Sequence, residues 1–148
     1  QQSASDWGCY EAFSLQLYQI DDDRFVVLQG QFEGYSVNYS FSTVDSSSAV
    51  QKTSIDLGDF YSLTSLPTGG FVVLGSTAYH LDIVLQRYEA DGTLLWQQVY
   101  DLNGDEQPYF VRERKEGGFA ILGTTNSIGA GGDDLWLLLT DADGNALP

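Results

Sequence analysis

The stretches GGFVVLG (Gly69–Gly75) and GGFAILG (Gly117–Gly123) are near-copies of one seven-residue phrase, 48 positions apart in a chain of 148 residues. A weaker third copy, RFVVL (Arg24–Leu28), precedes the first stretch by 46 positions. Self-similarity at such a period is typical of repeat architectures. The chain is therefore predicted to contain three repeat units, at about residues 10–58, 59–105 and 106–148.

Each unit contains short apolar runs separated by turn residues, which in the middle unit are DFYSLTSL, GGFVVLGST, DIVLQRYE and TLLWQQVY. Aromatic and β-branched residues dominate these runs, and none is long enough for a good helix. The breaks fall on Pro67–Gly70 and Ala90–Gly92, and Gly92 is expected to take a positive φ angle in a tight hairpin. Each unit is thus predicted to be a four-stranded antiparallel sheet, with helix nearly absent.

The strands Phe71–Leu74 and Phe119–Leu122 are apolar at consecutive positions, which predicts that both are almost fully buried. By the same pattern, Leu135–Leu139 is expected to be covered on both faces. The covering layer is most simply the neighbouring sheet, and radial stacking of such sheets is the β-propeller. The predicted fold is all-β: a partial β-propeller of three four-stranded antiparallel blades, of which the last lacks most of its fourth strand because Pro148 aligns with Trp96.

Composition restricts the function classes. A formal net charge of −15 repels phosphate backbones and anionic lipid heads, so nucleic acid is a poor partner. There is no run of 18 or more apolar residues that would span a membrane. Cys9 is the only cysteine, which excludes an internal disulfide and a cysteine metal cluster.

The succession of GG-aromatic-x-x-x-G, Asp-x-x-Leu, a D-x-D-G turn and an apolar strand with Trp resembles the secreted β-propeller repeats of Bacteroidetes-type surface proteins. The match is good through Gly69–Trp96 and Gly117–Leu147, while the first unit has Asp23-Arg24 in place of the glycine pair. The resemblance implies a propeller fold and export, often by the type IX secretion route. It names no catalytic residue and no ligand.

A metal site is the sharpest chemical suggestion in the sequence. Asp101, Asn103 and Asp105 place oxygen ligands at alternate positions, as in the first half of a calcium loop. The fit is partial, because Gly104 precedes the third ligand and Arg112 stands where a glutamate is needed. A polar connection between blades explains the same residues, so no cofactor is predicted and calcium stays as the alternative.

Catalysis has less support than binding. His80 is the only histidine and is interpreted as a surface residue, and carboxylate pairs such as Asp133-Asp134 arise by chance in loops this acidic. Aromatic side chains in or beside loops could stack on sugar rings, although aromatics also fill the interfaces between blades. The candidate glycan-binding residues are Tyr35, Tyr39, Tyr79 and Tyr109.

The leading hypothesis is a non-enzymatic, secreted or cell-surface scaffold that acts through protein contacts. A glycan-binding module is the alternative, and a glycan-active hydrolase ranks third. The third unit should leave an open edge and an apolar surface, which a partner must cover. That partner is the rest of the polypeptide, a second copy or an outer-membrane protein, and its contacts are expected around Trp136 and Leu138.

Overall fold

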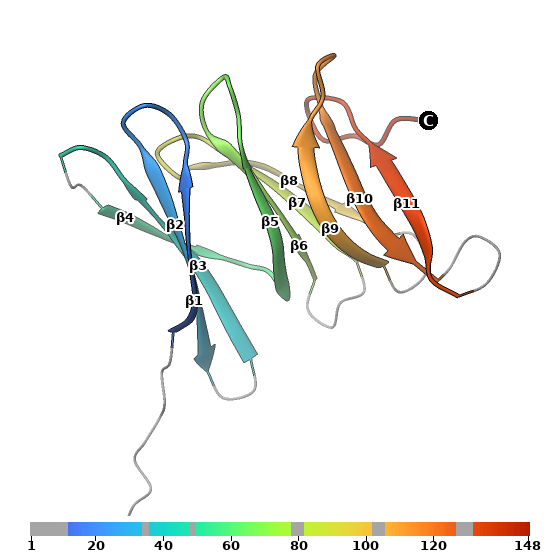
Figure 1. The fold of residues 1–148 in the computed structure, drawn as a ribbon, viewed down its shortest axis with the longest axis horizontal. Coiled ribbons are helices and arrows are strands. Elements are labelled where there is room, and N and C mark those ends of the chain that lie inside the picture. Colours follow the sequence, from blue (N-terminus) through green and yellow to red (C-terminus); the bar gives the residue numbers. More distant parts are fainter. Residues whose placement is uncertain (1–11, 34–35, 48–49, 78–81, 102–105, 127–131) are drawn as a thin grey trace, which may run out of the picture.

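The structure of the chain is a computed structural model that describes residues 12–33, 36–47, 50–77, 82–101, 106–126 and 132–148. These residues form eleven strands in three antiparallel sheets and contain no helix, which confirms the all-β prediction. The sheets follow one another along the chain and stand side by side (Figure 1). Since the described residues lack helices, they include none that could cross a membrane.

Each sheet is a meander in which every strand pairs with the strand before it. The first contains β1 (Ala12–Gln19), β2 (Phe25–Glu33), β3 (Ser36–Val44) and β4 (Val50–Ile55). The second contains β5 (Asp59–Ser65), β6 (Phe71–Ser76), β7 (Ile83–Tyr88) and β8 (Leu94–Tyr100). The third contains β9 (Glu106–Glu113), β10 (Phe119–Thr125) and β11 (Asp134–Leu139).

At the position of a fourth strand, the third sheet has only a short backbone contact with β11. An isolated bridge joins Thr140 to Ala146, and the Leu147 amide donates to the Leu139 carbonyl at 2.8 Å. The prediction of a last strand missing most of its length is confirmed for this sheet.

The repeated glycine pairs form the same turn, between the first and second strands, in the second and third sheets. Gly69 and Gly70 join β5 to β6 at φ angles of +90° and +80°, and Gly117 and Gly118 join β9 to β10 at +87° and +75°. Residues with side chains rarely adopt such angles, which is why the phrase opens with two glycines. Gly92 has a φ of +91°, as predicted, in the hairpin between β7 and β8.

The first unit makes the corresponding turn without glycine. One carboxylate oxygen of Asp21 accepts hydrogen bonds from the amides of Asp23 (3.0 Å) and Arg24 (2.8 Å). The guanidinium of Arg24 pairs with the other oxygen at 2.8 Å. An aspartate side chain thus closes this turn by bonding to the backbone two and three residues later.

The second sheet is sandwiched between the other two, and a hydrophobic core lies on each of its faces. Toward the first sheet, Phe71 packs edge-on against Phe41, with ring centroids 5.0 Å apart, and stacks on Tyr88 at 5.2 Å. Toward the third sheet, Trp96 meets Phe119 at 5.8 Å. All four residues of Phe71–Leu74 are 0% exposed, which confirms that prediction.

The third sheet is covered on one face only. Phe119 and Ile121 are buried, whereas Ala120 is only partly buried and Leu122 is 40% exposed, so the predicted full burial of Phe119–Leu122 is wrong at these two residues. The predicted double coverage of Leu135–Leu139 is also wrong, because Leu135 and Leu137 are 78% and 61% exposed. The reason is position: among the described residues, no further sheet follows the third.

Candidate functional site

The exposed face of the third sheet carries a continuous group of large apolar side chains. In the strand register, Phe110 lies opposite Leu122, and Leu122 lies opposite Leu137. Phe110 is 57% exposed, and Leu135 lies one pleat away from Leu137 on the same face. Together with Tyr109, these residues are called the outer face of the third sheet. Because soluble monomers rarely expose large contiguous apolar patches, this face is a candidate interaction surface.

Tyr109 joins this group because of a bulge in β9. The register between β9 and β10 shifts by one residue at Tyr109, between the Phe110 and Pro108 pairs. A bulge redirects the local side chain, and Tyr109 is 38% exposed with its hydroxyl donating to the Gln107 side chain at 3.1 Å. Its counterpart Tyr61 lies at a similar register shift in β5 and packs against the core between the second and third sheets.

The sequence predicts partner contacts around Trp136 and Leu138, but both side chains face the second sheet. Trp136 is 6% exposed, and its indole nitrogen donates to the Thr124 carbonyl at 2.8 Å. Leu138 also packs against the core facing the second sheet. Because side chains alternate along a strand, the neighbours Leu135 and Leu137 point outward instead. The outward-facing positions of β11 are therefore Leu135 and Leu137, each one residue away from an expected contact position.

The first sheet also has an open face. Leu17 is 68% exposed and pairs with Val27, whose side chain points away from the second sheet. Phe25 pairs with Val44, which in turn pairs with Val50. These five residues (Leu17, Phe25, Val27, Val44 and Val50) are called the outer face of the first sheet. Ser42 and Lys52 lie in the row of Val27, so polar side chains interrupt this face, as Arg112 and Thr124 do on the third sheet.

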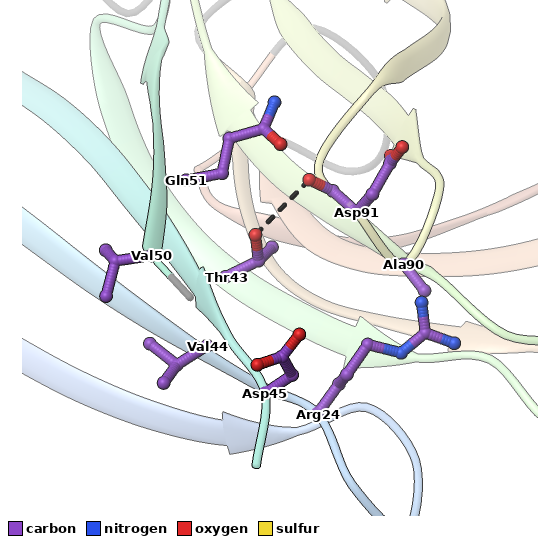
Figure 2. Close-up of a pocket in the computed structure, with 8 residues that line it drawn as sticks. All are labelled: Arg24, Thr43, Val44, Asp45, Val50, Gln51, Ala90 and Asp91. Atoms are coloured by element: carbon purple, nitrogen blue, oxygen red, sulfur yellow. Dashed lines mark hydrogen bonds between the residues drawn. The ribbon is translucent and has the colours of Figure 1, made fainter. Parts of the chain in front are cut away.

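A shallow pocket of about 330 Å³ lies between the first sheet and the β7–β8 hairpin (Figure 2). On one side of the pocket, the Thr43 hydroxyl donates a hydrogen bond to the Asp91 carbonyl at 3.2 Å. The Asp91 side chain accepts from the Thr93 amide, and this bond lowers the pKa of the Asp91 carboxyl. Arg24 lines the pocket but is already paired with Asp21. The Thr43–Asp91 bond thus holds the hairpin against the first sheet, while the side chains of Asp91 and Arg24 are engaged within their own turns.

The predicted glycan-binding tyrosines are not gathered into one site. Tyr39 is half-buried in β3, where its ring lies 6.3 Å from that of Phe60 at the contact between the first and second sheets. Tyr109 lies in the third sheet, so these two residues do not share a surface. Tyr35 and Tyr79 lie outside the described residues.

The predicted calcium ligands are mostly outside the described part of the chain. Asp101 is exposed directly after β8, whereas Asn103 and Asp105 belong to residues 102–105, which the structure does not describe. His80 and Cys9 also fall outside it. Among the described residues, no cluster of three or more His, Cys, Asp or Glu side chains is arranged to hold a metal ion.

The sequence pattern alone does not single out the outward-facing residues Phe110, Leu122, Leu135 and Leu137. The signal that could have found them is the repeat alignment, because Leu122 corresponds to Leu74 in the second sheet. Leu74 is 0% exposed only because the third sheet lies on it. At the same position in the third unit, no further sheet among the described residues lies on Leu122, which is 40% exposed.

Comparison with known proteins supplies no family. No protein-family model matches the chain, and no curated protein matches it in sequence.

Proposed function

We propose that the three sheets are successive blades of a partial β-propeller, and that the chain is a non-enzymatic scaffold, secreted or displayed at the cell surface, that works through protein–protein contacts. The propeller arrangement is supported by how the first strands meet. In β5, the Thr64 hydroxyl donates to the Val111 carbonyl of β9 at 2.7 Å, so neighbouring sheets contact each other through their first strands. The three sheets otherwise repeat one meander topology, and the second and third also repeat the same glycine turns.

The observation that carries the functional proposal is the outer face of the third sheet. Its leucines and Phe110 are 40% to 78% exposed, in register, on strands whose opposite face is buried. Fully burying one such side chain is worth roughly 1.5 to 3 kcal/mol, so a partner that covers this face gains substantial free energy. Aromatic and aliphatic side chains without charge are also typical of the centre of a protein interface.

The glycan-binding alternative has less support. It would need several exposed aromatic rings on one surface, and among the described candidates Tyr39 packs between sheets while Tyr109 stands with aliphatic neighbours. Tyr109 beside Phe110 fits protein contact at least as well.

A site-specific photocrosslinker tests the proposal in the cells that make the protein. A benzophenone amino acid placed at Leu137 should give discrete protein adducts. The matched control is Leu95, which is 47% exposed on β8 and lies outside both outer faces. Equal labelling at the two positions, or no adduct from Leu137, would contradict a protein-contact function for this face.

A further inference from the structure

We infer that the outer face of the third sheet binds the outer face of the first sheet of a second copy of this chain, in a head-to-tail contact. This inference rests on the proposed function, since it names the protein partner of the same surface. It follows from the way the three sheets already pack on one another, because the second sheet docks on the first with one face and receives the third with the other.

The receiving faces are equivalent in all three sheets. Leu28, Leu74 and Leu122 occupy one repeat position. Leu28 is buried against the second sheet and Leu74 against the third, while Leu122 is open. The residues that pair with them across the ladder, Phe41, Leu85 and Leu137, follow the same series from buried to open. Among the described residues, the outer face of the third sheet is therefore a receiving face on which no sheet docks.

The docking faces form the complementary series. Leu63 and Val111 are buried against the preceding sheet, whereas Leu17, which holds the same register position, is 68% exposed. Phe71 and Phe119 dock on the preceding sheet, and Phe25 is their counterpart in the first sheet. The outer face of the first sheet is therefore a docking face that meets no other sheet in the part of the chain that the structure describes.

A second copy satisfies both faces with one kind of contact. At each existing interface a phenylalanine of the second strand meets an aromatic ring of the preceding sheet, Phe71 on Phe41 and Phe119 on Trp96. In a head-to-tail pair, Phe25 of one copy would dock beside Leu122 and Leu137 of the other, in the place that Phe71 and Phe119 take at the existing interfaces, with leucines instead of an aromatic ring on the receiving side. A symmetric contact between two third sheets would set two receiving faces together, with no docking phenylalanine between them.

Head-to-tail association makes a specific prediction about mixtures of variants. Leu17→Glu disables only the docking face and Leu137→Glu only the receiving face, and both side chains are more than half exposed, at 68% and 61%. Each variant alone should be a monomer, since every contact would contain a charged face. Mixed together, they should form a one-to-one pair, because the intact receiving face of the first variant meets the intact docking face of the second.

Sedimentation velocity on the purified 148-residue chain measures this directly. The wild type should rise above monomer mass over roughly 1 to 100 µM, as weak interfaces do. Leu95→Glu is the matched control and should associate like the wild type. Circular dichroism checks that each variant is folded. If either variant fails to fold, Val50→Glu and Leu135→Glu replace them, at 64% and 78% exposure on the same two faces.

Two results would overturn the inference. A wild type that stays monomeric up to about 100 µM would exclude the second copy as partner, because even a weak interface with a micromolar dissociation constant would form at that concentration. Association that survives Leu17→Glu but not Leu137→Glu would mean a symmetric contact. If the wild type is monomeric and the Leu137 crosslinker captures a different protein, the proposed function stands and only the second copy falls. A monomeric wild type together with no adduct from the Leu137 crosslinker would contradict both the inference and the proposed function.

Discussion

The Tyr100 hydroxyl, at the end of the second sheet, donates a 2.6 Å hydrogen bond to the Gly144 carbonyl in the last turn of the third sheet. The preceding pair of sheets has a similar bond, from Thr43 to the Asp91 carbonyl. In both cases the turn with the sequence Ala-Asp-Gly docks on the sheet before it. The repeated turn therefore closes a hairpin and also fastens neighbouring sheets together.

Tyr100→Phe should lower the free energy of unfolding by about 1 to 2 kcal/mol, because it removes a buried hydrogen bond and leaves the Gly144 carbonyl without this donor. Urea unfolding measures the change. Tyr109→Phe is the control, since that hydroxyl bonds to Gln107 at the surface, and it should change stability by less than about 0.5 kcal/mol. Equal effects of the two substitutions would mean that the Tyr100 bond adds nothing to the docking of the turn.

The paired glycines allow backbone strain to be separated from steric clash. Both Gly69 and Gly70 have positive φ angles, but a Cβ atom on Gly69 would meet nothing within 4 Å, whereas one on Gly70 would lie 2.2 Å from the Tyr88 carbonyl oxygen. Gly69→Ala should cost about 1 kcal/mol, from the backbone angle alone. Gly70→Ala should cost about 1 to 3 kcal/mol more, from the clash. Urea midpoints that are equal for the two variants would contradict this difference.

Leu85 and Leu137 hold the same repeat position in different surroundings, 0% and 61% exposed. Leu85→Ala should therefore cost about 2 to 5 kcal/mol through lost burial and a cavity. Leu137→Ala should stay within about 0.5 kcal/mol when measured at dilute, monomeric concentration. A large loss from Leu137→Ala under those conditions would mean that its face is covered within the single chain.

The same pair explains how far sequence could predict this molecule. The phrase around Phe71 and Phe119 predicted the strands, the turns and the number of units, because the local requirements of φ angle and burial repeat with the sequence. Burial of Leu137 depends instead on whether another sheet lies beyond its strand. Two copies of one pattern can therefore be core in one unit and surface in the next.

Sequence could predict which unit carries the candidate site, but not which face of that unit. An uncovered third unit follows from the repeat count, but the face that is uncovered follows from strand parity. Placing partner contacts at Trp136 and Leu138 required knowing which way β11 is turned. Leu135–Leu139 is apolar at every position, so no polar residue marks which side of the strand faces outward.

Alkaline pH should destabilise the fold through its buried tyrosines. Burial raises the pKa of Tyr88 from 10.0 to about 12, and burial also raises the pKa of Tyr100, with the Asp141 charge adding to it. The unfolded chain therefore loses these protons first, and stability present below pH 10 is lost as the pH rises toward 12. Urea midpoints measured across this range should fall less steeply in Tyr88→Phe, and still less in the double variant with Tyr100→Phe. An unchanged slope would exclude these phenols as the cause.

Salt should strengthen self-association of the wild type. Each copy carries a formal charge of −15, so two copies repel at long range, while the proposed contact joins mainly apolar side chains. The screening length falls from about 10 Å at 0.1 M salt to about 3 Å at 1 M, which removes most of this repulsion and leaves the apolar contact in place. Sedimentation in increasing sodium chloride should therefore shift the wild type toward the associated form, while Leu137→Glu should stay monomeric throughout. Association that weakens as salt is added would mean that ion pairs, rather than the leucines of the outer face, hold the copies together.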